Sequence, residues 1–132
     1  MTSSSKIRVL IAEDQTMLRG ALAALLSLEP DLTVIAEAAN GREAHKLTLT
    51  LAPDVVVTDI EMPDMDGFEL AQALRENPTS AAIPVIALSA MISSEAIERG
   101  RRVGFHDFVA KFDRTGLIAA IKEQTDDLHQ AA

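Results

Sequence analysis

The feature that most constrains the fold is the stretch from Pro53 to Gly67, which reads PDVVVTDIEMPDMDG. Its three consecutive valines, Val55 to Val57, form a β-branched run that suits a strand buried on both faces of a parallel sheet. The run ends in Thr58 and Asp59, and the prolines and glycine that follow mark a loop. We therefore expect Asp59 at the carboxyl end of a central strand, where open α/β sheets bind their ligands.

Similar strand patterns alternate with helix patterns five times along the chain. The predicted strands are Ile7–Ala12, Thr33–Glu37, Val55–Val57, Pro84–Leu88 and Phe105–Ala110. The predicted helices are Gln15–Leu28, Arg42–Leu51, Gly67–Arg75, Ser94–Val103 and Arg114–Leu128. This alternation predicts an α/β fold, a doubly wound parallel sheet with helices on both faces and right-handed crossovers. The second strand is short and polar enough to lie near an edge. In the first helix, the face expected to be buried carries Met17, Leu18, Ala21, Leu22, Leu25 and Leu26.

Composition limits the possible functions. A chain of 132 residues with 48% hydrophobic residues suits one globular domain, and we expect it at 6–128, with a disordered tail at 1–5 and a short tail at 129–132. The absence of Cys excludes a disulfide scaffold and a thiolate site. A net charge of -8 argues against direct nucleic acid binding. The first apolar run is too short for a signal peptide or a membrane span, so we expect a cytoplasmic protein with no membrane contact.

Polar residues at the strand ends carry the candidate chemistry. Glu13 and Asp14 follow the first strand, Asp59 and Ser89 end the third and fourth, and Lys111 follows the fifth. Three neighbouring carboxylates repel one another unless a cation neutralises them. Carboxylates without His or Cys are hard oxygen ligands, which suit Mg²⁺. Together with an ammonium and a hydroxyl, they describe a carboxylate nucleophile that accepts a phosphoryl group.

With these residues in view, the chain resembles the CheY-like receiver domain of two-component response regulators. The pieces that carry the resemblance are the acidic pair Glu13–Asp14, VVVTDIEMPDMDG, the ALSA of the fourth strand and the FVAK of the fifth, in the family's order and spacing over about 6–128. The resemblance implies a flavodoxin-like sheet of strand order 2-1-3-4-5 with five helices. It also implies a phosphorylation-dependent signalling switch with a histidine kinase as partner, which catalyses only its own phosphorylation and dephosphorylation.

The same resemblance implies a role for each matched residue. Asp59 resembles the phosphoacceptor, and Lys111 the residue that pairs with a phosphoryl oxygen. Mg²⁺ would be held by the side chains of Glu13, Asp14 and Asp59 and by the backbone carbonyl of Glu61. Ser89 and Phe108 would be the switch hydroxyl and the aromatic switch. Ala90 would leave room for the phosphodonor, and Glu61 and Met91 would tune hydrolysis.

The chain departs from the family pattern in two ways. Many members have Pro after the lysine of the fifth strand, where this chain has Phe112. Without Pro, the cis peptide of that junction would cost about 3 kcal/mol more. In addition, the first half, to about Leu74, resembles receivers of LuxR-type regulators. The second half, from about Ile83, resembles receivers fused to chemotaxis-type histidine kinases, which suggests a chimera.

Other interpretations of these residues stay open. Asp59 could form a turn, Glu13 or Asp14 could cap the first helix, Lys111 could be solvated and Phe108 could belong to the core. At the level of function, the alternatives are an FMN-binding flavodoxin-like protein, an aspartyl phosphatase, or a receiver-like interaction module or engineered scaffold that is not phosphorylated. The acidic segment after the first strand argues against the first of these, because it would repel a phosphate without a metal. We expect the effector to lie outside this chain, and we expect a possible homodimer to form through the fourth and fifth helices.

Overall fold

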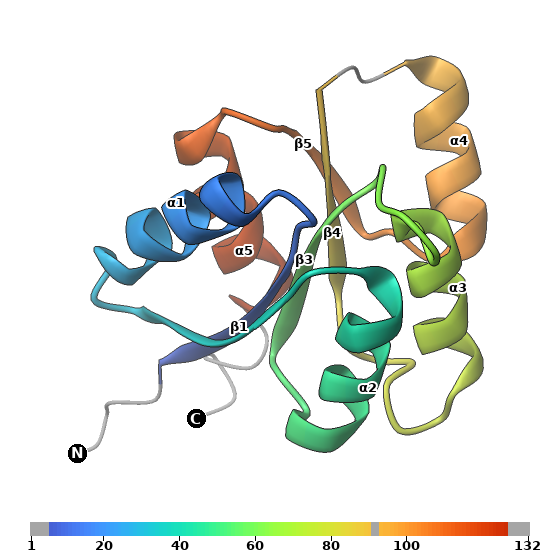
Figure 1. The fold of residues 1–132 in the computed structure, drawn as a ribbon, viewed down its shortest axis with the longest axis horizontal. Coiled ribbons are helices and arrows are strands. Elements are labelled where there is room, and N and C mark those ends of the chain that lie inside the picture. Colours follow the sequence, from blue (N-terminus) through green and yellow to red (C-terminus); the bar gives the residue numbers. More distant parts are fainter. Residues whose placement is uncertain (1–5, 91–92, 127–132) are drawn as a thin grey trace.

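The structure is a computed structural model that describes residues 6–90 and 93–126, and it shows a parallel sheet between two layers of helices (Figure 1). The elements are β1 (Ile7–Ala12), α1 (Thr16–Ser27), β2 (Leu32–Ala38), α2 (Gly41–Leu51), β3 (Val55–Asp59), α3 (Gly67–Glu76), β4 (Val85–Ser89), α4 (Ser94–Val103), β5 (Asp107–Ala110) and α5 (Arg114–Gln124). The five strands follow the order β2-β1-β3-β4-β5. This confirms the predicted fold class and the edge position of the polar strand β2.

The sheet separates two hydrophobic cores, with α1 and α5 on one face and α2, α3 and α4 on the other (Figure 1). Successive side chains of a strand point to opposite faces, so each central strand contributes side chains to both cores. In β1, Val9 and Ile11 pack with α1 and α5, whereas Leu10 packs with α2 and α3. In β3, Val57 belongs to the core on the α1 and α5 face, and Val56 belongs to the core on the opposite face. This double burial explains why these strands are apolar at every position.

The register of the sheet brings the carboxyl ends of the strands to one edge. Ala12 of β1 lies beside Thr58 of β3, Asp59 lies beside Leu88 of β4, and Ser89 lies beside Ala110 of β5. The residues that follow these positions therefore leave the sheet at the same level. All five positions of β3 are buried, so the central strand gives this edge a rigid base.

Local signals fix the helix ends around this edge. Asp66 and Glu69 form a capping box at the start of α3. Ser93 caps α4 by accepting a hydrogen bond from the N–H of Ala96. Gly104 ends α4 with a φ of 116°, in the left-handed region that favours glycine.

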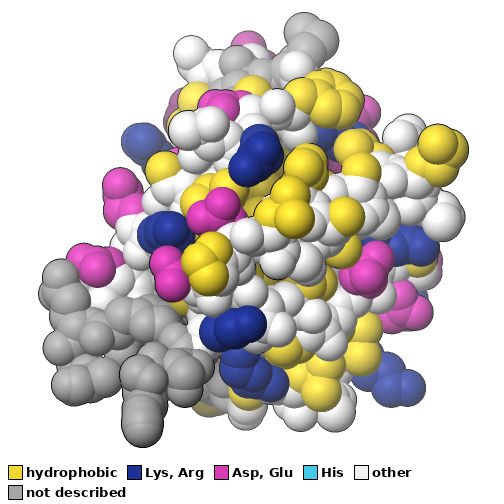
Figure 2. Space-filling view, turned by 90° about the vertical axis from the view of Figure 1, so that its left-hand side faces the viewer, with side chains coloured by type: hydrophobic (Ala, Val, Ile, Leu, Met, Phe, Trp, Pro, Cys, Tyr) yellow, Lys and Arg dark blue, Asp and Glu magenta, His cyan; other side chains and the backbone are white. Residues whose placement is uncertain are grey.

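Several expectations from the sequence need correction. Met17 is 89% exposed, because α1 buries chiefly Leu22 and Leu26 while the apolar stripe continues onto its solvent side. Figure 2 shows hydrophobic side chains among charged ones on this side of the molecule. Strand β5 begins at Asp107, not at Phe105, because the N–H of Phe105 bonds to the carbonyl of Gly100 and so belongs to the end of α4.

Further differences concern ends of elements. The N-cap of α1 is Gln15 and has no side-chain hydrogen bond, so Asp14 does not cap this helix. Regular helix α5 ends at Gln124, and the predicted end at Leu128 lies outside the described residues, as do the tails at 1–5 and 129–132. The peptide bonds of the described residues are trans. In the described part of the chain, no helix has the length and apolar character needed to cross a membrane.

Candidate functional site

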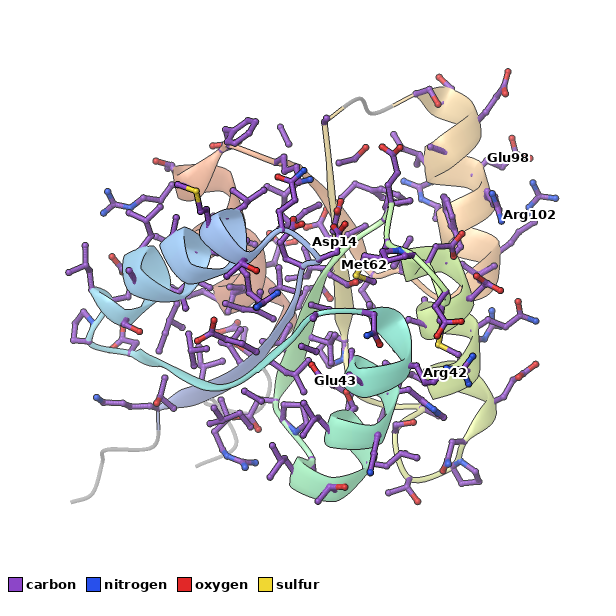
Figure 3. The ribbon with its side chains drawn as sticks, viewed as in Figure 1. Asp14, Arg42, Glu43, Met62, Glu98 and Arg102 are labelled. Atoms are coloured by element: carbon purple, nitrogen blue, oxygen red, sulfur yellow. The ribbon has the colours of Figure 1, made fainter. Side chains whose placement is uncertain are left out.

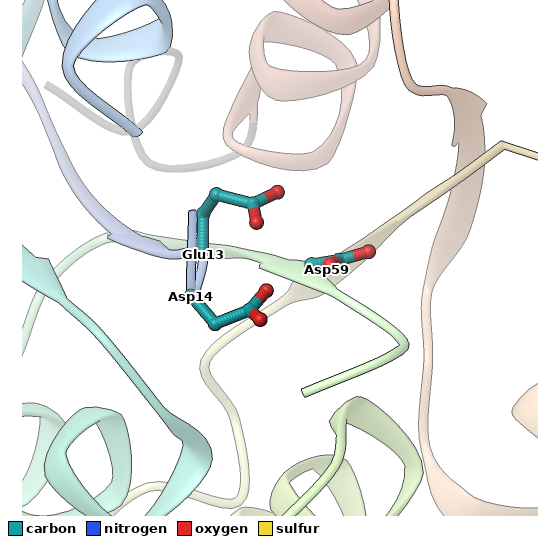
Figure 4. Close-up of side chains that lie close together, drawn as sticks. All are labelled: Glu13, Asp14 and Asp59. Atoms are coloured by element: carbon teal, nitrogen blue, oxygen red, sulfur yellow. The ribbon is translucent and has the colours of Figure 1, made fainter. Parts of the chain in front are cut away.

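Three carboxylates from two strands converge at the carboxyl edge of the sheet. Oxygen atoms of Glu13, Asp14 and Asp59 all lie within 4.8 Å of one another, and their side chains approach one another above the ends of β1 and β3 (Figure 4). The N–H of Glu13 donates to the carbonyl of Ala38, which extends the β1–β2 pairing by one residue and fixes the acidic pair at the strand end. Asp14 also appears at the sheet edge in the wider view of Figure 3.

Glu13 is the most deeply buried of the three, at 0% exposure. Its Oε2 accepts a hydrogen bond from the N–H of Gln15 at 3.0 Å, and its carbonyl accepts one from Nη1 of Arg19 at 2.8 Å. Among the described residues, its Oε1 has no hydrogen-bond partner. A buried carboxylate oxygen without a hydrogen bond is costly, so this atom favours a nearby cation, and the ammonium of Lys111 is one. The sequence did not predict this bond of Arg19, which holds the backbone of Glu13 just after β1.

Lys111 completes the cluster from the end of β5. Its Nζ lies 3.2 Å from Oδ2 of Asp59, to which it donates a hydrogen bond, and 3.4 Å from Oε1 of Glu13. Its backbone N–H donates to the carbonyl of Ser89 at 3.0 Å, which extends the β4–β5 pairing and holds the lysine over the sheet edge. The structure thus brings together four of the residues that the sequence placed at strand ends.

The electrostatics of the cluster follow from its burial. Burial raises the pKa of Asp59, and Lys111 and the N–H of Glu61 offset only part of that effect. Burial likewise raises the pKa of Glu13. Burial alone would lower the pKa of Lys111, but the carboxylates of Asp59 and Glu13 outweigh it and raise this pKa. One ammonium therefore faces three acidic groups, and an additional cation with a preference for oxygen ligands, such as Mg²⁺, fits the donor set.

The loop between β3 and α3 (residues 60–66) closes the site on its α2 side. The N–H of Gly67 donates to the carbonyl of Ile60 at 2.8 Å, and the N–H of Gly41 donates to the carbonyl of Met65 at 3.2 Å. A Cβ at Gly67 would lie 2.6 Å from the carbonyl oxygen of Asp59, so this close return of the chain requires glycine. Glu61 is exposed on this loop, beside the carboxylate of Asp59.

The remaining predicted residues lie near the β4 and β5 ends. Ser89 is buried at the end of β4 and Ala90 is exposed immediately after it. Phe108 is half-buried, with its ring edge-on to that of Phe105 at 5.4 Å and directed at Gly100 of α4. Met91 lies outside the described residues.

Comparison with known proteins agrees with this geometry. The family model described as the response regulator receiver domain matches residues 9–122. The chain is 40% identical over 129 residues, 96% of its length, to protein-glutamate methylesterase/protein-glutamine glutaminase 2 of Carboxydothermus hydrogenoformans, and these residues cover 35% of that protein. It is 44% identical over 105 residues, 80% of its length, to the uncharacterized transcriptional regulatory protein YvfU of Bacillus subtilis, of which they cover 52%.

Solved structures show the same relationship. The signal receiver domain of NarL from Mycobacterium tuberculosis superposes with a TM-score of 0.84 at 29% identity, over 92% of this chain and 98% of that one.

The chain spans from about a third to half of the length of the two curated relatives. It belongs to the response regulator receiver domain family, whose members are phosphorylation-dependent switches of two-component signalling.

Proposed function

We propose that Asp59 is the phosphoacceptor of this receiver. The observation that supports this most strongly is the position of Lys111, whose ammonium lies between the carboxylates of Asp59 and Glu13 while Asp14 completes the acidic cluster. This carboxylate is 3% exposed and lies at the carboxyl end of the central strand. That is the side on which open α/β sheets bind ligands.

In the proposed reaction, a carboxylate oxygen of Asp59 attacks the phosphorus atom of a phosphohistidine or a small acyl phosphate. A new P–O bond forms, the bond to the donor nitrogen or oxygen breaks, and the electron pair leaves with the donor. Lys111 favours the ionised form of Asp59 and would offer its ammonium to a phosphoryl oxygen. Receivers bind Mg²⁺ in an acidic pocket, and here Glu13, Asp14, Asp59 and the carbonyl of Glu61 would hold it; the ion neutralises charge on the phosphoryl oxygens.

Phosphorylation of Asp59 would change the conformation of the protein as far as α4. We assign Ser89 as the hydroxyl that binds the new phosphoryl oxygen, since it lies beside Lys111 at the end of β4. We assign Phe108 as the aromatic switch, since its ring packs on Gly100 of α4. Phosphorylation would then shift the population between inward and outward positions of this ring. Glu61 and Met91 would tune hydrolysis by controlling the approach of water.

The expected phosphodonor is a histidine kinase. An apolar groove of about 240 Å³ next to Lys111 supports a protein partner, because Leu18 and Leu25 of α1 and the 82% exposed ring of Phe112 line it. The effector, a homodimer through α4 and α5 and a cytoplasmic location are parts of the same proposal, and they rest on the family. The activities of the longer relatives are not carried over, because this chain matches only part of them.

Incubation with acetyl phosphate tests the phosphoacceptor assignment. With Mg²⁺, the intact mass of the wild type should increase by one phosphoryl group, and Asp59→Asn or the removal of metal by EDTA should abolish the increase. Asp54→Asn is a matched control, because Asp54 precedes the same strand but bonds to the N–H of Arg8, away from the cluster. If the wild type binds Mg²⁺ but gains no phosphoryl group, the chain is instead a receiver-like interaction module.

A further inference from the structure

A second pocket lies at the end of the sheet opposite to Asp59, between α3 and α4. It has a volume of about 250 Å³ and is lined by the C-terminal parts of α3 and α4, the segment before β4 and the segment between α4 and β5. Its polar lining residues include Arg75, Ser80, Arg101 and His106. Among the residues that the structure describes, no carboxylate belongs to the lining, although the protein as a whole carries a net charge of -8.

The two arginines of this pocket come from different helices. Nη1 of Arg75 donates to the carbonyl of Arg102 at 2.7 Å, which holds its guanidinium across the end of α4 and leaves its other N–H donors available. Within 6–90 and 93–126, Arg101 makes no salt bridge. Both side chains are exposed overall, so solvent reaches the pocket and screens their charges.

His106 adds a neutral donor. Its Nδ1 accepts a hydrogen bond from the N–H of Val85 at 3.0 Å, so the proton of the neutral ring resides on Nε2, which is then a donor. Desolvation lowers the pKa of His106, which favours this neutral form near neutral pH. The pocket thus combines two guanidinium groups and one imidazole N–H, all donors of the kind that bind oxyanions.

Arginines in the last turns of two helices also complement the helix dipoles. That role explains the bond of Arg75 to the end of α4, but each helix end carries only roughly half an elementary charge. Two guanidinium groups exceed this partial charge, so the residues that line the pocket carry a net positive charge. Helix dipoles therefore account for part of the arrangement and leave capacity for an anion.

We propose that this pocket binds a small oxyanion, with a phosphate or phosphate monoester as its ligand class. The planar guanidinium fork matches the geometry of phosphate oxygens. The volume is below the roughly 300–1,000 Å³ of pockets for drug-sized ligands, which favours a small anion over a dinucleotide. Bound between Arg75 and Arg101, the anion would tie the end of α4 to α3. This site is separate from the phosphoacceptor site and requires neither Mg²⁺ nor Asp59.

The test is a titration with inorganic phosphate in EDTA at constant ionic strength, followed by ¹H–¹⁵N NMR. The backbone amides of Gly104 and His106 report on the pocket, and those of Asp59 and Glu61 on the phosphoacceptor site. The wild type and Asp59→Asn should both show saturable shifts at Gly104 and His106. Arg101→Gln should raise the dissociation constant about tenfold, as expected for one lost charge-assisted hydrogen bond.

Arg102→Gln is the matched control, since it removes the same charge from the same turn of α4 but its side chain points away from the domain (Figure 3). Retained affinity in Arg102→Gln and weakened affinity in Arg101→Gln support the site. Shifts that do not saturate, an unchanged dissociation constant in Arg101→Gln, or equal losses in both variants would overturn it. A dispersed spectrum of each variant verifies that it is folded. Because no phosphodonor is present, failure here leaves the phosphorylation proposal intact.

Discussion

Replacing Lys111 by Met should destabilise the metal-free protein strongly, because it removes the only ammonium in the described acidic cluster. Its Nζ contacts Asp59 at 3.2 Å and Glu13 at 3.4 Å, and its side chain is only 13% exposed. At an effective dielectric constant near 20, each contact is worth about 5 kcal/mol of Coulomb energy. Much of this offsets the desolvation of the ammonium, and breaking a buried pair typically costs about 3–5 kcal/mol. We expect a loss of about 3 kcal/mol at neutral pH.

The loss should depend on pH with a definite sign. Burial raises the pKa of Asp59 and Glu13 in the folded state, and removing Lys111 would raise both further. The folded variant then holds protons more tightly than the unfolded chain, so its stability falls as the pH rises above the unfolded-state values. The difference from the wild type should be small near about pH 4 and largest near about pH 8.

Urea unfolding in EDTA, followed by circular dichroism, measures this difference, since the chain has no Trp or Tyr for fluorescence. Lys122→Met is the control, because Lys122 is 43% exposed and pairs with Glu29 and Asp31 near the protein surface. It should cost less than about 1 kcal/mol. Equal losses in the two variants, or a loss for Lys111→Met that does not change with pH, would refute the account of the cluster.

Three further results are expected. Gly100→Ala should cost about 1–3 kcal/mol in urea unfolding, because its Cβ would overlap the ring of Phe108; a neutral effect would contradict that packing. Gly20→Ala should instead stabilise α1 by about 0.5–1 kcal/mol, since nothing lies within 4 Å of the new Cβ; destabilisation would show that the helix surface is not open there. Mg²⁺ at a hundredfold excess over its Kd should add about 2.7 kcal/mol to the free energy of unfolding, and Asp14→Asn should weaken the metal's binding; an equal gain in both proteins would place the ion elsewhere.

The strand ends could be predicted from the sequence because each apolar run is short and stops at a polar residue. Once the alternation implies a parallel sheet, Glu13, Asp59, Ser89 and Lys111 must emerge at one edge, as the register shows. Helix boundaries were predictable where a capping residue was explicit, as at Ser93.

The features that the sequence did not predict depend on tertiary contacts. The apolar stripe of α1 is wider than the face that the sheet covers, which left Met17 exposed. Phe105 has the residue type of a strand, but its N–H bonds to the end of α4. Arg75 and Arg101 lie far apart in sequence and line one pocket. The chimeric origin of the two halves stays a prediction. The two curated relatives do not test it, because each matches most of the chain and not one half alone.

The most direct test of the central claim locates the phosphoryl group. After incubation with acetyl phosphate and Mg²⁺, borohydride reduces an aspartyl phosphate to homoserine, which survives proteolysis. Trypsin should release residues 47–75 as one peptide, which contains Asp54, Asp59, Asp64 and Asp66. Tandem mass spectrometry is predicted to find homoserine at Asp59 alone. Homoserine at one of the other three positions, or in a different peptide, would contradict the assignment of Asp59 as the phosphoacceptor.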